Sequence, residues 1–234
     1  MPVRRLSFKI RKIHRYLGVF LGIQFLLWTL SGLYFSWTDI DEIHGDHYKN
    51  MEYQAKAFKN LVSPSRLPVQ EGIRSIELRE INNNPYYWVN GNQLFNARTG
   101  EAKAGINEKE ALAVAKRRLI PTLAVAGVER IEQVDNHHEY RSGPLPAYVI
   151  SFKNSDNLKA YVSIKDGKLQ TIRHRSWRWF DFLWMSHTMD YKTRDNFNTL
   201  VLRAFSLLGL ITVLSGFTLW YVSSPLRRRI NKST

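Results

Sequence analysis

Residues 17–37 read LGVFLGIQFLLWTLSGLYFSW, a run of 21 residues that carries no formal charge. As a helix this run is about 31 Å long, at roughly 1.5 Å per residue, which matches the hydrocarbon thickness of a bilayer. A second apolar run covers residues 200–222, near the other end of the chain. We therefore predict two transmembrane helices that form an antiparallel hairpin, with everything between them on one side of a membrane.

The net charge of +14 is concentrated beside these two runs. Six Lys or Arg residues lie in 1–16 and four lie in 223–234, and neither segment contains Asp or Glu. The middle of the chain, residues 38–199, holds 23 basic residues against all 20 acidic ones. The positive-inside rule therefore places both tails in the cytoplasm and the middle outside it. This distribution favours contact with the headgroups of a lipid bilayer and argues against a nucleic-acid-binding protein.

The chain contains no cysteine, which excludes disulfides, thiolate metal sites and thiol catalysis. The first apolar run is too long for the core of a signal peptide, and no small-x-small cleavage site follows Gly32. We therefore predict an uncleaved anchor.

The segment between the two runs has the patterns of an α+β domain. Asn90-Gly91 separates two β-rich stretches, as in a hairpin with a type I′ turn. Asn107 and Glu110 form a capping box for a helix that Pro121 ends, and 165–168 (KDGK) is a second hairpin turn. Further strands are predicted at about 127–134, 145–153, 158–164 and 168–173.

A weak internal repeat relates residues 73–102 to residues 128–170. Both segments read strand, polar turn, strand, turn, strand and a final Gly turn. If the repeat is complete, the helix of the first copy falls in 57–66. The predicted units are therefore about 57–102 and 107–173, and they share one system of antiparallel sheets.

Aromatic residues crowd the sequence SWRWFDFLWMSHTMDY at 176–191. Amphipathic rings settle at membrane interfaces, and this stretch is too short to span a bilayer. The predicted organisation is a tail at 1–16, a transmembrane helix at 17–37, a domain at 38–175, an aromatic interfacial segment at 176–199, a transmembrane helix at 200–222 and a tail at 223–234.

Small and polar residues mark both apolar runs and predict close helix packing. The two small-residue sets either face each other within one chain or form a contact with a second copy or another membrane protein. Gln24 needs a hydrogen-bond partner in lipid, either on the other helix or on a cofactor or partner. The predicted packing residues are Gly18, Gly22, Gln24, Ser31 and Gly32 in the first run and Ser206, Gly209, Ser215 and Gly216 in the second.

Three segments of the chain resemble one known family. Residues 107–173, with the sequences EKEALAVAKRRL, AYVISFKN and LKAYVSIKDGKLQ, are similar to a PepSY domain. The sequences KIHRYLGVFLGIQFLLWTLSGLYF and LRAFSLLGLITVLSGFTLWY are similar to the membrane helices of PepSY-associated transmembrane proteins. On this resemblance the chain is a short, two-helix version of that family.

The resemblance implies a protein of the bacterial inner membrane with a periplasmic PepSY-like domain. Some larger members are similar to ferric-siderophore reductases, which carry haem between membrane helices. Some isolated PepSY domains regulate proteases, and other members are accessory proteins. This chain has two membrane helices rather than four or more, so a complete transmembrane electron path is not implied.

Four histidines are candidate ligands if the cofactor is haem b: His14, His44, His47 and His187. His14 matches the family's KIHRxLG pattern, and His187 resembles the histidine that precedes the later membrane helix. Helix rise separates these two by about 35 Å, so one haem cannot use both within one chain. Two arrangements stay open: His187 with His44 or His47 at the outer surface, or His14 with His14 of a second copy at the inner surface.

No catalytic motif is present in a supporting context, which favours a protein that is not an enzyme without deciding the question. The leading prediction is an accessory or binding subunit of an envelope complex, linked by the resemblance to iron or siderophore uptake. The alternatives are a haem-binding electron-transfer protein, which would be an oxidoreductase similar to ferric reductases, and an extracytoplasmic protease regulator. The predicted partners are other membrane protein subunits or a second copy of the chain.

Overall fold

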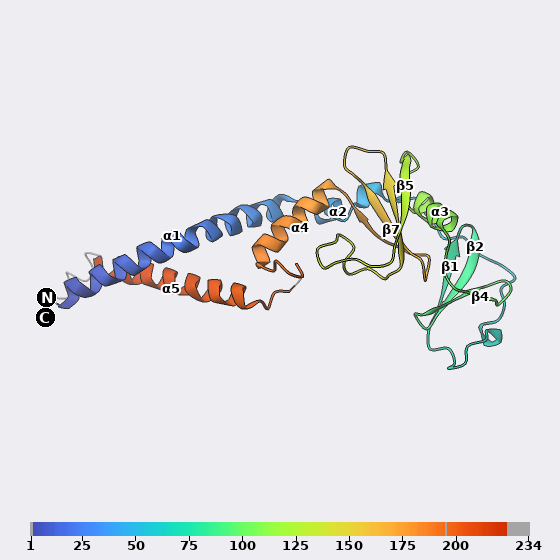
Figure 1. The fold of residues 1–234 in the computed structure, drawn as a ribbon, viewed down its shortest axis with the longest axis horizontal. Coiled ribbons are helices and arrows are strands. Elements are labelled where there is room, and N and C mark those ends of the chain that lie inside the picture. The colour runs from blue at the N-terminus through green and yellow to red at the C-terminus, as the bar shows by residue number, and fades with distance from the viewer. Residues whose placement is uncertain (1, 195, 224–234) are drawn as a thin grey trace. The chain divides into compact units, whose positions relative to one another are not determined.

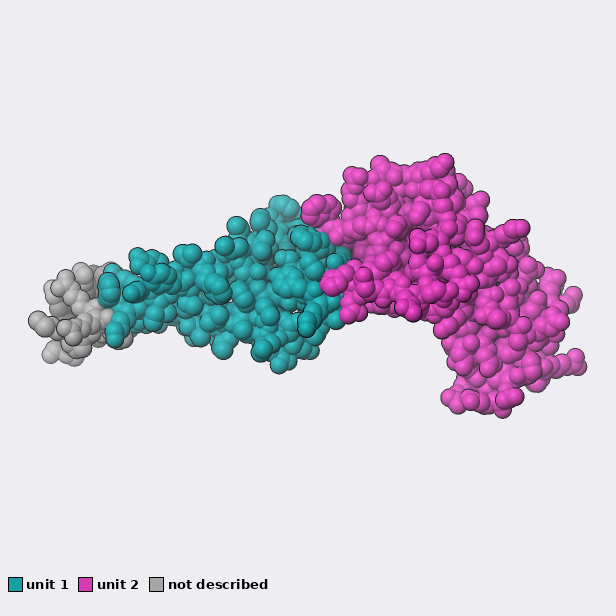
Figure 2. Space-filling model, viewed as in Figure 1, with its two compact units in different colours: residues 1–37, 181–234 teal, residues 38–180 magenta. Residues whose placement is uncertain are grey.

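The computed structural model describes residues 2–194 and 196–223, which belong to two compact units (Figures 1 and 2). Residues 1–37 and 181–234 make up the first, here called the helical unit, and residues 38–180 make up the second, called the sheet unit. The chain is α+β, as predicted, with two long apolar helices and two antiparallel sheets. Most of the basic tail predicted over 223–234 lies outside the described residues.

Both predicted spans are helices long and apolar enough to cross a membrane, at Phe8–Trp37 and Leu200–Tyr221. They belong to α1 (Pro2–Trp37) and α5 (Leu200–Ser223). Helix α1 begins well before residue 17, because 2–16 contains no helix breaker except Pro2, which the first helical turn tolerates. Apolar side chains on both helices are largely exposed, which distinguishes them from the core helix of a soluble protein: Val19 is 72%, Ile23 71% and Leu207 60% exposed.

The second half of the sheet unit contains a four-stranded meander, β5 (Val125–Ile131), β6 (Ala147–Phe152), β7 (Lys159–Ser163) and β8 (Leu169–Arg173), in that spatial order. These are the four strands predicted from the pattern. The predicted turn joins β7 to β8: Gly167 has φ +65°, and the Asp166 carboxylate accepts a hydrogen bond from the Lys168 N–H.

The first half of the sheet unit forms a separate sheet, β1 (Ile76–Ile81), β2 (Asn84–Val89), β3 (Gln93–Asn96) and β4 (Ala102–Lys103), also in chain order. The Asn90-Gly91 turn is confirmed, because both residues have the positive φ angles, 52° and 74°, that a type I′ turn requires. Strands β1 and β4 are the two edges of this sheet, as β5 and β8 are of the other.

A single helix, α3 (Glu108–Arg118), packs against β6, β7 and β8 of the second sheet and against β1 of the first. Both halves of the predicted capping box between Asn107 and Glu110 are present. One apolar cluster joins the helix to both sheets, and it includes Ile81 of β1, Ala115 of α3 and Val162 of β7, all at most 1% exposed. The two sheets therefore share a core.

The helix expected in 57–66 is absent. That segment contains only a short 3₁₀ turn, η2 (Pro64–Arg66). Pro64 lies within this segment and Pro68 follows just after it. Leu61, Leu67 and Val69 instead pack against the face of the first sheet that α3 does not cover. The repeat is therefore one of strands and turns only, with α3 serving both sheets.

Two short elements follow α1 in the chain, α2 (Ile40–Ile43) and η1 (Asp46–Tyr48), before η2 and the first sheet. The aromatic segment forms α4 (Arg175–Thr188), a helix that the boundary between the two units divides after Phe180. Its last turns, from Asp181 on, belong to the helical unit.

Within the helical unit, α1 and α5 pack against each other, and two small positions on α5 each face a ring from α1. A Cβ on Gly209 would lie 3.1 Å from the Phe25 ring, and one on Gly216 would lie 3.3 Å from His14. By the same measure Gly18, Gly22 and Gly32 have no neighbour within 4 Å in the described structure, and Ser206 is exposed.

Candidate functional site

Polar side chains of α1 form hydrogen bonds with the end of α4. In a bilayer such side chains need a hydrogen-bond partner within the protein. Trp28 Nε1 donates a 2.8 Å hydrogen bond to the carbonyl of His187, and Gln24 Nε2 lies 3.4 Å from the carbonyl of Ser186. The last carbonyls of a helix have no partner within it, so α1 satisfies part of the C-terminus of α4. Gln24 therefore makes an interhelical contact, although with α4 rather than with α5.

His187 lies within this contact. Its Nδ1 is 2.7 Å from Ser31 Oγ, and its ring packs against the rings of Phe35 and Trp28. The Ser31 hydroxyl has one proton and lies 2.7 Å from the Leu27 carbonyl, which accepts it. In the tautomer that carries its proton on Nδ1, His187 donates to Ser31 and Nε2 keeps its lone pair.

His14 of α1 makes the same kind of contact with a serine of α5. Its Nδ1 is 2.7 Å from Ser215 Oγ, and that hydroxyl donates to the carbonyl of Thr212. In the same tautomer Nε2 of His14 also keeps its lone pair. A hydrogen-bonded Nδ1 beside an available Nε2 is the form in which histidine ligates a metal.

Each imidazole thus suits a single haem ligand, but the pair does not form one site. Seventeen residues of α1 separate His14 from Ser31, the partner of His187, or about 26 Å by helix rise. In the sheet unit His44 and His47 are exposed, and the His47 ring contacts that of His174 at 5.4 Å between centroids, which leaves no room for iron between them. Neither His14 with His187 nor His47 with His174 provides the two facing axial ligands that a bis-histidine haem needs.

His174 is itself a structural residue. It is 2% exposed, its Nε2 bonds the Ile43 carbonyl at 3.1 Å, and its ring contacts Tyr48. Burial lowers the pKa of His174 below its usual value. Burial, with a hydrogen bond to Asp156, raises the pKa of Tyr48 to about 12. Among the described residues, no group of three or more His, Asp or Glu is placed to hold a metal ion, and this includes the acidic segment at 39–47.

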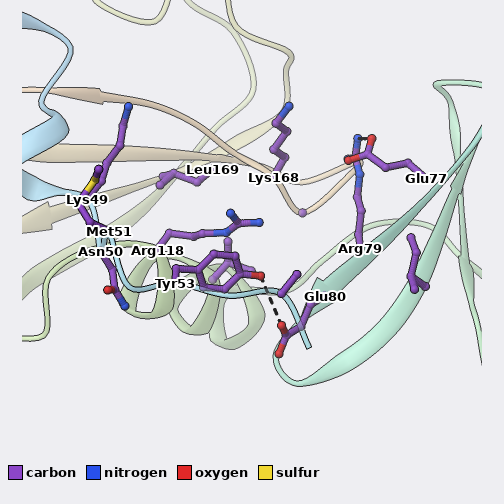
Figure 3. Close-up of a pocket in the computed structure, with 14 residues that line it drawn as sticks. Lys49, Asn50, Met51, Tyr53, Glu77, Arg79, Glu80, Arg118, Lys168 and Leu169 are labelled. Atoms are coloured by element: carbon purple, nitrogen blue, oxygen red, sulfur yellow. Dashed lines mark hydrogen bonds and ion pairs between the residues drawn. The ribbon is translucent and has the colours of Figure 1, made fainter. Parts of the chain in front are cut away.

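The sheet unit contains a cavity of about 400 Å³ that the sequence did not predict (Figure 3). Four segments line it: residues 49–55, strand β1, the end of α3 and the turn at 167–169. Figure 3 shows Tyr53 and Arg118 on one side and Arg79 with Glu77 on the other. The Arg118 guanidinium lies 3.9 Å from the centre of the Tyr53 ring, in a cation–π contact.

The acidic side chains of this cavity each have a basic partner. Glu77 lies 2.7 Å from Arg79, which also pairs with Asp166, and Glu80, 3% exposed, pairs with Arg117 at 2.6 Å. Lys168 on the rim has no acidic partner among the described residues. The cavity therefore offers positive charge, an aromatic ring and apolar wall, which suits recognition of an anionic group.

One local signal could have pointed to this cavity. Along β1, Arg79 occupies the same face as buried Ile81, where an apolar residue is expected from strand alternation. The other lining residues come from segments far apart in the chain, and no sequence pattern joins them. Comparison of the chain with protein-family models, curated proteins and solved structures gives no significant match.

Proposed function

We propose that this chain is an inner-membrane accessory or binding subunit of a larger envelope complex, of the PepSY-associated type and linked to iron or siderophore uptake. The observation that carries the proposal is the cavity of the sheet unit. It presents an unneutralised Lys168, the stacked Arg118 and the edge of β1, which are groups for binding a partner. The link to iron uptake rests on the sequence resemblance alone.

The proposed topology follows from charge and helix length. α1 and α5 cross the membrane as an antiparallel hairpin, both basic tails lie in the cytoplasm, and the sheet unit lies in the periplasm. The hydrogen bonds from Gln24 and Trp28 to the end of α4 support this arrangement, since they satisfy polar groups beside an apolar helix.

The test is purification of the full chain with an affinity tag from native membranes in mild detergent. We expect a partner that co-elutes in fixed ratio through size exclusion and that captures this chain when the tag is moved to the partner. An unrelated two-helix membrane protein with the same tag is the control. A lone protein with no reproducible partner would contradict the proposal.

The competing proposal is a haem-binding electron-transfer protein, and the hydrogen-bonded Nδ1 of His14 and His187 favours it. Because the two do not form one site within a chain, the haem would need a histidine from a second copy or an arrangement of the two units that supplies His44 or His47. Protein from haem-replete cells should then show a reducible Soret band that His187→Ala or His14→Ala abolishes and His137→Ala retains. A colourless protein would eliminate this alternative.

A further inference from the structure

Strand β1 has an open edge that faces away from its only partner, β2. Pro85 of β2 lies opposite Glu80, and its carbonyl accepts a hydrogen bond from the Ala97 N–H on the β3 side. Pro85 therefore points toward β3, so the backbone N–H and C=O of Glu80 point outward. By alternation the same groups of Leu78 and Ile76 also point outward, and within the described residues they have no hydrogen-bond partner.

The cavity runs along this open edge. Its lining includes the four consecutive residues from Glu77 to Glu80. Successive side chains of a strand point to opposite faces, so a cavity that contacts four in a row must lie beside the strand rather than over one face. The backbone groups of Leu78 therefore border the cavity.

The side chains of Ile76 and Leu78, whose backbone groups point outward, do not prevent another strand from pairing with this edge. Natural edge strands are commonly blocked by Lys, Pro or a covering loop. Here Ile76 is 40% and Leu78 is 44% exposed, and both are apolar. Two further lining residues, Lys168 of the turn after β7 and Arg118 of α3, have no acidic partner among the described residues.

We propose that β1 binds an extended, acidic peptide segment of a partner protein, which adds a strand to the first sheet and directs its carboxylates to Lys168 and Arg118. Backbone hydrogen bonds to Ile76 and Leu78 supply affinity, and the two cations select for acidic side chains. This inference rests on the proposed function and names its partner chemistry. A second copy of this chain, paired edge to edge through β1, is the alternative occupant.

The binding test uses the purified full chain in detergent and a fluorescent peptide of about eight residues that alternates valine and glutamate. We expect saturable binding by fluorescence anisotropy. A peptide in which lysine replaces glutamate should bind at least about tenfold more weakly. The acidic peptide N-methylated at every backbone nitrogen keeps its side chains but cannot donate the strand hydrogen bonds, and it should not bind.

Two variants test the two parts of the surface. Lys168→Glu should weaken the acidic peptide about tenfold or more, whereas Lys165→Glu, the same charge change in the same turn but outside the cavity, should change binding less than about twofold. Leu78→Pro removes an outward N–H and no ladder bond, so it should abolish binding while circular dichroism shows the sheet intact.

Several outcomes would overturn the inference: no binding of the acidic peptide, equal binding of its N-methylated form, or equal losses with Lys165→Glu and Lys168→Glu. If Leu78→Pro fails to fold, the lysine pair still decides. A concentration-dependent dimer that Leu78→Pro dissociates would assign the edge to a second copy. If a native partner co-purifies with Lys168→Glu and Leu78→Pro as well as with the unchanged chain, the proposed function stands and this inference fails. If the peptide binds but no native partner co-purifies, the inference stands and the proposed function fails.

Discussion

Arg79 makes a polar contact between the two sheets of the sheet unit. From β1 its guanidinium reaches the turn between β7 and β8, where it pairs with the Asp166 carboxylate at 2.7 Å and bonds the Asp166 carbonyl at 3.0 Å. The two side chains are only 11% and 12% exposed, and the guanidinium also lies over the Trp88 ring. Such a pair depends on both members, because either one alone would be a poorly hydrated charge.

Arg79→Ala should therefore destabilise the sheet unit by about 2–3 kcal/mol, since it leaves Asp166 without its partner. The measurement is thermal unfolding of the full chain in detergent, followed by circular dichroism. Arg74→Ala is the matched control, because its ion pair with Glu71 is about 80% exposed on both sides and should contribute nothing measurable. Equal changes in the two variants would show that the Arg79 contact is not needed.

His174 should make the sheet unit less stable in mild acid. Its pKa is lowered by burial in the folded state, so the unfolded chain binds its proton more readily. Stability is then lost as pH falls below about 6.5, the pKa of an exposed histidine, until the lower folded pKa is passed. Of the charged groups nearby, His47 also disfavours protonation of His174, whereas Asp156 favours it.

Unfolding midpoints measured between pH 7.5 and pH 5 check this expectation, with both values chosen to bracket a histidine pKa of about 6.5. The native chain should lose more stability across this interval than His174→Gln, which cannot take up the proton. Parallel pH curves for the two proteins would assign the acid sensitivity to other groups.

At the scale of elements, the loop between β5 and β6 is built around a pair of stacked rings. Tyr140 lies 4.6 Å from Tyr161 of β7, centroid to centroid, and its hydroxyl bonds the Pro144 carbonyl at 3.0 Å. Gly143 passes directly over the buried Tyr140 ring, and a Cβ there would lie 2.1 Å from it. The ring cannot retreat because Tyr161 lies behind it.

Gly143→Ala should thus cost about 2 kcal/mol or more, because one added carbon overfills a closed space. Gly127→Ala in β5 is the comparison, since a Cβ there meets nothing within 4 Å and its φ is not positive. That change should be neutral or slightly stabilising. Thermal unfolding of the two variants decides, and an unchanged midpoint for Gly143→Ala would mean that the loop can open.

At the scale of the whole molecule, the cysteine-free chain permits a direct test of topology. Lys12→Cys and Lys165→Cys place single thiols on exposed residues of the helical and sheet units, with no native thiol to interfere. A membrane-impermeant maleimide should label Lys165→Cys in intact spheroplasts and label Lys12→Cys only after lysis. The opposite pattern would invert the proposed orientation, and labelling of both before lysis would deny the crossing.

The sequence by itself determined the elements whose causes are local. The two long apolar helices follow from the length and apolarity of 17–37 and 200–222. The hairpins follow from Asn90-Gly91 and 165–168, and the start of α3 follows from its capping box. Each depends on side chains within a few residues of one another, so periodicity and turn chemistry are sufficient to predict it.

Only the tertiary structure decided which distant segments meet. One helix, α3, packs against both sheets, and no second helix forms at 57–66. Rings of α1 lie against Gly209 and Gly216 of α5. Four separate segments of the chain come together to line the cavity. Such contacts depend on how the whole unit buries its apolar surface. A residue such as Arg79 therefore acquires its partner only when β1 and the turn before β8 are brought together around α3.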